Sequence, residues 1–377
     1  MRIQQIDALR GFALFGILMV NIFVFHAPYP HYSTFYGEFE GANAAALENM
    51  IFFCGGKFMF IYAFLFGYSF WMQYERKKSD FRGYWNRRML VLAGFGVLHI
   101  LLLSFGDILL PYALLGFSLP FFAKFSNAKL FLWVLLISLI PVYEFVLRGF
   151  IDFSSIFMQP VASLEQYIEI NRNGSWREIF ELRLKDYFSF KNEKLIIYIP
   201  KEISLFLLGM IAARKQLATQ LSVKRGVLFC IFAVLVIGSM YFFRAQIIGF
   251  FDFQASIIQS ILLGLIIHIT EFVHGALYIV LFFLLWTIRP IQKLQYWLTF
   301  PGKLSLTNYI AQSLICAILF SELDYYGQLT PIQLICCVLA IYLGQLIFSV
   351  IWLRYYQYGP LESIWRKLAK KKAMGAL

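Results

Sequence analysis

A histidine and an aspartate lie close together in a strongly apolar part of the chain. His99 falls within the run LVLAGFGVLHILLLSFGDILL, and Asp107 follows it across a short segment that contains Ser104 and Gly106. A neutral imidazole held by a carboxylate is the usual preparation for a general base. The pair therefore predicts a site in which His99 takes a proton and Asp107 orients the ring, with a purely structural histidine as the alternative.

A second set of polar residues follows one stripe of the first apolar run. At about 100° per residue, Asp7, Arg10 and Asn21 fall within about 60° of one another on a helix. Asp7 and Arg10 have the spacing of an ion pair. Ionisable groups in a bilayer are costly and usually face a partner or a wet cavity. The stripe predicts either a binding surface or an ion pair that fixes helix packing.

Four more residues are candidates for substrate contact. Lys57 follows two glycines in GGKF, where a backbone or a ligand can approach closely, unless its side chain extends to the membrane interface. His26 lies in the connection after the first apolar run. Asn308 and Gln312 share one side of a predicted helix, where hydrogen bonds between helices are the favoured interpretation. Lys57 and Asn21 are also candidates to stabilise an oxyanion.

The composition places these polar residues inside a membrane. Hydrophobic residues make up 60% of the 377 residues and charged residues only 14%, against about 25% charged in an ordinary soluble domain. Mean hydropathy is +0.69. A water-soluble globule is excluded, because so much apolar surface must face lipid. The lipid bilayer is therefore the first predicted partner.

The apolar runs predict an all-α fold, a polytopic integral membrane bundle of about ten transmembrane helices, within a range of about nine to eleven. The predicted spans are residues 6–26, 48–73, 88–105, 107–124, 129–148, 195–214, 226–244, 254–288, 304–322 and 330–353. No internal repeat or low-complexity linker divides the chain, so we expect a single membrane domain over residues 1–377.

Residues 149–194 are predicted to form an external, partly amphipathic insertion in this domain. Trp176, Phe180, Leu184 and Phe188 recur at every fourth position between charged residues. That spacing favours a helix lying at the outer membrane interface. A cap packed on the spans is the alternative.

The positive charge predicts the orientation of the chain. There are 33 Lys and Arg residues against 21 Asp and Glu, a net charge of +12. The basic residues fall mainly in short connections between apolar runs, as expected for loops on the cytoplasmic face. Both termini are therefore predicted to be cytoplasmic, and nucleic acid is not expected as a partner.

Five segments resemble one family. RIQQIDALRGFALFGILMVN, GGKFMFIYAFLFGYSF, RRMLVLAGFGVLHILLLSFGDILLPYALLG, GKLSLTNYIAQSL and YGPLESIWR occur in this order. They resemble the YeiB family of bacterial multi-pass membrane proteins, whose domain was catalogued as of unknown function and labelled as possibly involved in transport. The resemblance implies a bacterial cytoplasmic membrane protein.

The opening segment also resembles a wider superfamily of transmembrane acyltransferases, which includes heparan-alpha-glucosaminide N-acetyltransferase. That enzyme moves acetyl from coenzyme A to a terminal glucosamine, with an asparagine and a histidine after the opening helix serving the chemistry. Asn21 matches this asparagine, whereas His26 follows it at a shorter spacing than the enzyme's histidine. His99 and Asp107 are then the better candidates for the base and its orienting partner.

Two functions follow as hypotheses. The first is a membrane acyltransferase that moves an acyl group, acetyl in the simplest case, from coenzyme A near Arg10 to an extracytoplasmic sugar or lipid acceptor at His99. Acetyl coenzyme A is then the donor substrate, and neither a tightly bound cofactor nor a metal is expected. The alternative is a transporter or permease for a small molecule, in which the same polar residues line the pathway. No prediction of an oligomeric state follows from the sequence.

Overall fold

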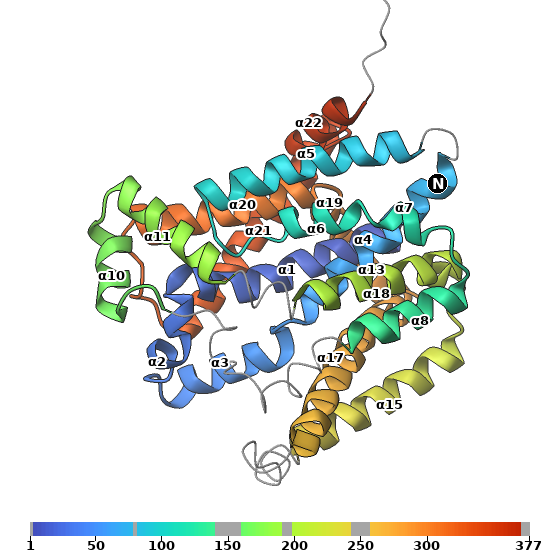
Figure 1. Cartoon of the computed structure of the whole chain (residues 1–377), viewed down its shortest axis with the longest axis horizontal. Coiled ribbons are helices and arrows are strands. Elements are labelled where there is room, and N and C mark those ends of the chain that lie inside the picture. Colours follow the sequence, from blue (N-terminus) through green and yellow to red (C-terminus); the bar gives the residue numbers. More distant parts are fainter. Residues whose placement is uncertain (1–2, 78–80, 140–159, 191–197, 243–256, 371–377) are drawn as a thin grey trace, which may run out of the picture.

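The computed structural model describes residues 3–77, 81–139, 160–190, 198–242 and 257–370, and this part of the chain contains helices and no strand. The helix bounds are α1 (Gln4–His26), η1 (Tyr29–His31), α2 (Tyr32–Tyr36), α3 (Gly41–Cys54), α4 (Lys57–Arg76), α5 (Phe81–Leu102), α6 (Leu109–Gly116), α7 (Leu119–Phe122), α8 (Asn127–Ser138), α10 (Leu164–Asn173), α11 (Trp176–Ser189), α13 (Ile199–Arg214), α14 (Leu217–Gln220), α15 (Val223–Phe242), α17 (Ile257–Leu285), α18 (Arg289–Trp297), α19 (Thr299–Lys303), α20 (Ser305–Ala317), η4 (Ile318–Glu322), α21 (Pro331–Tyr355) and α22 (Pro360–Ala369). Several long helices, among them α1, α5 and α20, run roughly along one direction, and α17 runs steeply across them (Figure 1).

The core forms around α1 and α4, which pack against each other and against several other helices. Small residues allow the closest approaches. A Cβ built on Gly67 of α4 would lie 1.9 Å from the Phe206 carbonyl oxygen of α13, and one built on Gly209 would lie 2.0 Å from the Phe64 carbonyl oxygen. Close backbone contact through glycine is typical of helix pairs in membranes, where packing replaces the hydrophobic driving force.

Large apolar side chains cover the outside of the bundle. Leu235 and Phe242 on α15 and Leu343 on α21 are each more than half exposed. Exposed apolar surface on this scale marks an interface with another apolar phase. The helical membrane fold expected from the composition is therefore confirmed.

The number of predicted spans is not confirmed. Four stretches of described residues are long and apolar enough to cross a bilayer: Gln4–His26, Gly41–Arg76, Val223–Phe242 and Pro331–Tyr355. Ile269–Leu285 with Arg289–Trp297, bent by 116°, makes a fifth if the pair is counted as one span. The other predicted spans coincide with shorter or more polar helices.

Local sequence explains where the predicted spans break. The predicted span 107–124 is divided into α6 and α7, with Pro120 in the first turn of α7. Proline lacks the N–H that would continue the preceding helix. In the predicted span 48–73, α3 and α4 are separated by Gly55 and Gly56, and Gly56 has φ of 74°, a left-handed conformation that glycine adopts readily. The last parts of spans 129–148 and 226–244 lie outside the described residues.

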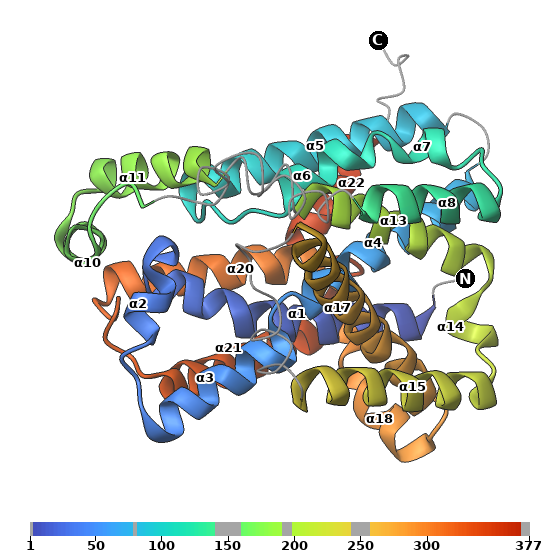
Figure 2. The same cartoon turned by 60° about the horizontal axis from the view of Figure 1, so that its bottom comes forward.

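The two ends of the bundle differ. The N-terminus lies at one end, and α2, α10 and α11 lie at the other, as both views in Figures 1 and 2 show. Arg76 and Lys77 end α4 on the side of the N-terminus. We call these the basic end and the cap end. Ile3 and Arg366 line the same cavity, so the two described chain ends lie on the same side of the bundle.

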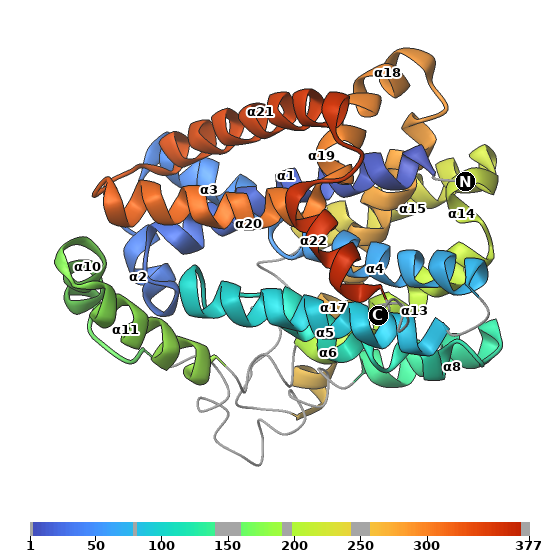
Figure 3. The same ribbon diagram turned by 90° about the horizontal axis from the view of Figure 1, so that it is seen from above.

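Part of the predicted insertion forms the hairpin of α10 and α11 at the cap end (Figure 3). The two helices begin at capping boxes formed by Ser163 and Ser175. In each, the serine hydroxyl accepts a hydrogen bond from a first-turn backbone N–H that has no partner within the helix, which stabilises the helix start. On α11, Trp176 and Phe188 are largely exposed. Residues 149–159 and 191–194 of the insertion lie outside the described part.

Candidate functional site

His99 connects two other polar side chains in the interior of the bundle. Its Nδ1 lies 3.1 Å from Asp107 Oδ1, and its Nε2 lies 2.8 Å from Ser313 Oγ. The His99 and Asp107 side chains are 1% and 0% exposed, and Ser313 is 2% exposed. We call Asp107, His99 and Ser313 the central cluster. An aspartate, a histidine and a serine in this order of contacts have the connectivity that prepares a serine hydroxyl as a nucleophile.

Local structure holds each member of the central cluster in place. His99 lies on the last turns of α5, and the Asp107 carboxylate accepts a hydrogen bond from Leu110 N at 2.7 Å at the start of α6. A carboxylate is favoured at a helix N-terminus because it meets unpaired N–H groups there. The Tyr309 ring of α20 stacks on the imidazole with centroids 5.2 Å apart. The ring of His99 is therefore restrained at Nε2 by Ser313 and on one face by Tyr309. The Asp107 carboxylate lies beside Nδ1 without the geometry of a hydrogen bond.

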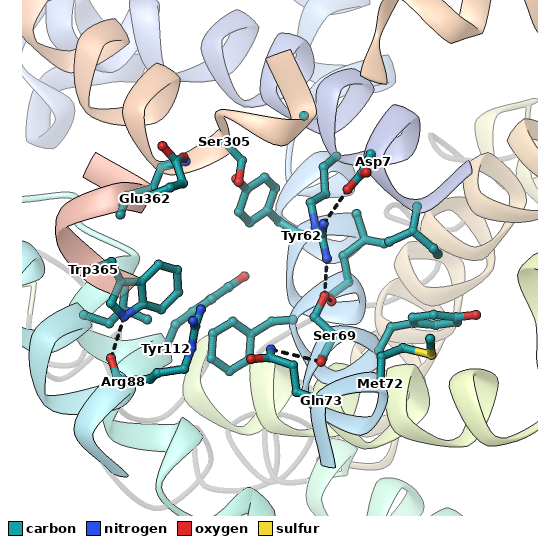
Figure 4. Close-up of a pocket in the computed structure, with 18 of the residues that line it drawn as sticks. Asp7, Tyr62, Ser69, Met72, Gln73, Arg88, Tyr112, Ser305, Glu362 and Trp365 are labelled. Carbon is teal, nitrogen blue, oxygen red and sulfur yellow. Dashed lines mark hydrogen bonds and ion pairs between the residues drawn. The ribbon is translucent and has the colours of Figure 1, made fainter. Parts of the chain in front are cut away.

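A cavity of about 570 Å³ extends from the basic end toward the central cluster. We call it the inner cavity. Figure 4 shows Glu362, Ser305, Tyr62, Ser69 and Arg88 around the same hollow. Its lining comes from α1, α4, α5, α6, α19, α20 and α22, and it includes Tyr309. Because Tyr309 also stacks on His99, this ring both lines the cavity and contacts the central cluster.

The Asp7 and Arg10 side chains line this inner cavity. Arg10 Nη1 donates to Asp7 Oδ1 at 2.9 Å, which is the pairing that their spacing predicts. The other Arg10 nitrogen donates to Ser69 Oγ on α4, and Figure 4 shows this connection. The pair is therefore part of a polar wall of the inner cavity and also ties α1 to α4.

A smaller crevice of about 80 Å³, which we call the outer crevice, lies at the cap end. Leu103 and Ser104 from the end of α5 line it, as do Cys316 and Ala317 from α20. On α20 the inner cavity therefore reaches Tyr309, the central cluster holds Ser313 and the outer crevice begins at Cys316. The central cluster lies between two hollows that open on opposite sides of the bundle.

Asn308 and Gln312 face α21 rather than the central cluster. Asn308 Nδ2 donates to Ser349 Oγ at 3.1 Å, and Gln312 Nε2 donates to Gln345 Oε1 at 2.8 Å. Gln345 Nε2 in turn donates to the Asn308 carbonyl at 2.8 Å. These bonds link α20 and α21, which agrees with the favoured interpretation of the two residues.

His26 lies at the cap end, apart from the central cluster. Its Nε2 accepts a hydrogen bond from Leu329 N, and its Nδ1 lies 2.9 Å from the Tyr36 hydroxyl. Both ring nitrogens therefore have partners in a fully buried setting. Such a histidine joins α1 to the cap end of the fold.

Lys57 and Asn21 also lie apart from the central cluster. Lys57 Nζ donates to the Ile51 carbonyl at 3.3 Å, at the junction of α3 and α4. Asn21 is part-buried on α1 and makes no hydrogen bond to the central cluster in the part of the chain that the structure describes. The oxyanion role of either residue stays a prediction.

Ser313 is the member of the central cluster that sequence analysis did not identify. It belongs to the segment GKLSLTNYIAQSL, beside Gln312. A serine four residues after an inward-facing tyrosine lies on the same side of a helix, and this was the one available signal. In the described residues, no group of three or more His, Cys, Asp and Glu could hold a metal ion.

The fold and the site define a class of protein. It is a helical membrane protein with a buried aspartate, histidine and serine between a large inner cavity and a small outer crevice. Residues 212–372 match the family described as Protein of unknown function (DUF418). No solved structure matches the chain.

Relatives of similar length identify the family. Uncharacterized protein YxaH of Bacillus subtilis (strain 168) is 30% identical over 97% of this chain and 93% of its own length. Uncharacterized protein YeiB of Escherichia coli (strain K12) is 26% identical over 99% of this chain and 97% of its own. A 39.9 kDa protein in the amylase 3' region of Bacillus acidopullulyticus is 27% identical over 97% and 93%. The chain belongs to the YeiB family of membrane proteins.

Proposed function

We propose that this protein transfers an acyl group, acetyl in the simplest case, from a coenzyme A thioester to an extracytoplasmic sugar or lipid. The observation that carries the proposal is the sequence of contacts from Asp107 through His99 to Ser313, with separations of 3.1 and 2.8 Å. A nucleophile, a base and an orienting carboxylate are the groups that acyl transfer requires. The resemblance of the opening segment to transmembrane acyltransferases supports the choice of donor.

The chemistry takes two steps. Ser313 Oγ attacks the thioester carbonyl while His99 Nε2 accepts the serine proton. The C–S bond then breaks, and the thiol leaves with the proton that His99 returns. In the second step an acceptor hydroxyl or amine attacks the serine ester and gives its proton to Nε2. The C–O bond to Ser313 breaks, and Oγ recovers the proton from His99.

Asp107 has a positioning role in both steps. Its carboxylate faces Nδ1, and this favours the tautomer in which Nε2 is the unprotonated nitrogen. The positively charged imidazole that forms when Nε2 accepts a proton is stabilised by the same carboxylate. Asp107 is itself held by Leu110 N, so the orientation of the imidazole is fixed before substrate binds.

The two hollows supply separate routes for donor and acceptor. We infer from the excess of basic residues that the basic end faces the cytoplasm, where coenzyme A is found. The donor then enters the inner cavity, and the thioester reaches Ser313 when the Tyr309 ring turns aside. The acceptor approaches from the outer crevice, which begins one helical turn beyond Ser313.

Transfer of label tests the proposal. Purified full-length protein is incubated with radiolabelled acetyl coenzyme A and bacterial envelope extract, and label in the extract is counted. We expect transfer by the unaltered protein and a loss of at least about 100-fold for His99→Ala, because general base catalysis contributes about 10²–10⁴-fold. Absence of both label transfer and coenzyme binding would contradict acyl transfer.

A matched pair of serine variants separates the nucleophile from general effects on packing. Ser313→Ala removes the hydroxyl of the central cluster. Ser349→Ala removes a fully buried hydroxyl on α21 that accepts a hydrogen bond from Asn308 instead. We expect loss of transfer in the first variant and retention in the second, with both folded by size-exclusion chromatography. Full transfer by Ser313→Ala would refute the serine ester and leave His99 acting directly on the acceptor.

One observation favours a transporter as the second candidate function. The inner cavity and the outer crevice lie on opposite sides of the central cluster, as a pathway with alternating access requires. In that case Tyr309 and the central cluster form a polar gate. Uptake of substrate into vesicles without chemical change, abolished by His99→Ala, would favour transport over acyl transfer.

A further inference from the structure

The inner cavity is lined by more positive than negative side chains. Its carboxylates are Asp7 and Glu362, and both have partners within the protein. Asp7 pairs with Arg10, and Glu362 accepts hydrogen bonds from Leu306 N at 2.7 Å and Thr307 N at 3.1 Å. The six basic side chains that line the cavity are Arg10, Arg76, Lys77, Arg88, Lys303 and Arg366.

Three of these cations rest on aromatic rings. Arg88 lies 4.0 Å from the centre of the Trp365 ring, Lys77 lies 3.8 Å from that of Tyr84, and Arg366 lies 3.9 Å from that of Tyr358. A ring holds a cation in place through its quadrupole but does not neutralise its charge. The cations are therefore positioned at the cavity while their positive charge remains available to an anion.

Arg88 gives a second, independent indication of an anionic ligand. Its guanidinium lines the cavity, and its Nε is buried without a hydrogen-bond partner among the residues that the structure describes. A buried N–H on a charged group is costly unless an acceptor meets it. The Trp365 indole donates to the Arg88 carbonyl at 2.8 Å and fixes the two residues together, as Figure 4 shows.

The rest of the lining is apolar. Leu65, Phe66, Met89 and Leu92 line the cavity, together with Tyr112, and Tyr309 lies in the same wall beside the central cluster. A volume of about 570 Å³ is in the usual range of about 300–1,000 Å³ for sites that bind small molecules. The cavity thus combines a positively charged mouth with an apolar interior.

We propose that the inner cavity binds a phosphate-bearing amphiphile, with the phosphate at Arg88 and Arg366 and a slender apolar chain directed toward Tyr309. Guanidinium groups suit phosphate because their N–H donors match two of its oxygens at once. The proposal concerns binding alone and holds whether or not the central cluster transfers an acyl group. Two sources supply this chemistry: a soluble thioester such as acetyl coenzyme A, and a phospholipid of the membrane.

Paired ligands with and without phosphate test the proposal. Purified full-length protein in micelles of a detergent without phosphate is titrated with acetyl coenzyme A against acetyl pantetheine, and with lysophosphatidic acid against monoacylglycerol. We expect the phosphate-bearing member to bind at least about tenfold more tightly in at least one pair, with an affinity that falls as salt rises. Equal affinity within both pairs would overturn the proposal.

Variants on one helix locate the site. Arg88→Ala removes a cavity cation, and Arg82→Ala removes an exposed cation of the same helix that does not line the cavity. We expect about tenfold weaker binding of the phosphate-bearing ligand for Arg88→Ala and unchanged binding for Arg82→Ala. Arg88→Lys, which retains the charge, should recover part of the loss if Arg88→Ala folds poorly. Unchanged binding by folded Arg88→Ala would refute the placement of the phosphate.

The coenzyme pair and the lipid pair of ligands distinguish failure of this proposal from failure of the proposed function. Phosphate-dependent binding in the lipid pair alone supports the amphiphile site and removes coenzyme A as the donor. Label transfer from acetyl coenzyme A with no phosphate dependence in either pair would support acyl transfer and overturn the amphiphile site.

Discussion

Substitution of Asp107 by asparagine separates a positioning role from a structural one. The Asp107 side chain is fully buried, with Oδ2 2.7 Å from Leu110 N and Oδ1 3.1 Å from His99 Nδ1. Asparagine has the same shape, so no cavity forms. Its amide oxygen still accepts from Leu110 N, and its NH₂ group then faces the imidazole.

This exchange reverses the proton positions on His99. An amide NH₂ is a donor only, so Nδ1 must become the acceptor and the ring proton moves to Nε2. Nε2 then no longer accepts the Ser313 proton at the 2.8 Å contact. We expect acyl transfer to fall by about 10⁴-fold, the loss seen when a triad aspartate becomes asparagine and equivalent to about 5.5 kcal/mol of activation free energy.

The expected loss of stability is much smaller. One hydrogen bond from Leu110 N changes from a charged to a neutral acceptor, which costs about 1 kcal/mol. The assay compares label transfer from acetyl coenzyme A with thermal unfolding of the same preparations. Asp324→Asn, at a mostly exposed position near Arg172, is the matched control. Folded Asp107→Asn protein that transfers label within tenfold of the unaltered rate would refute the assignment of Asp107.

Two further predictions concern packing and pH. Gly67→Ala places a methyl group 1.9 Å from the Phe206 carbonyl oxygen, so we expect the free energy of unfolding to fall by about 1–3 kcal/mol. Gly94→Ala is the control, because nothing lies within 4 Å of the added methyl group. Its thermal unfolding temperature in detergent should be unchanged or slightly higher. The second prediction concerns pH. Burial raises the pKa of the Asp186 carboxyl at the cap end to about 7, so the folded state favours the neutral form of this group. The free energy of unfolding therefore falls as pH rises from about 4 through 7. The protection factors of the α11 amides, which remove the pH dependence of the chemical exchange rate itself, should fall over this range by about tenfold per pH unit at most, and Asp186→Asn should abolish this fall. An unchanged pH profile in that variant would contradict the role of Asp186.

The sequence predicted the parts of the site that are near each other along the chain. His99 and Asp107 meet because a short turn after α5 returns the chain to the start of α6. Asp7 and Arg10 pair because three residues make nearly one helical turn. Such contacts depend on local geometry, which spacing determines.

Contacts between distant segments could not be predicted in this way. Ser313 meets His99 only because α20 packs beside α5, and Gln345 meets Gln312 only because α21 packs beside α20. Spacing fixes the face on which a residue lies but does not fix which helix covers that face. The inner cavity, which is lined by seven helices, could not be predicted from spacing for the same reason.

The number of predicted spans is not confirmed for a related reason. Hydropathy alone does not distinguish an apolar segment that crosses the bilayer from one that is broken within the bundle. Pro120 marks such a break between α6 and α7, although residues 107–124 form an apolar run long enough to span a bilayer. The spacing of Trp176 and Phe188 falls on α11, where both side chains are exposed, and the external position of the insertion stays a prediction.

The acyl state of Ser313 is the most direct test of the proposed chemistry. Full-length protein is incubated with acetyl coenzyme A in the absence of acceptor, quenched in acid and digested for peptide mass spectrometry. The proposal predicts acetyl on Ser313 in the unaltered protein, its loss on addition of envelope extract, and its absence in His99→Ala. An unmodified Ser313 in protein that nevertheless transfers acetyl to the extract would contradict the serine ester.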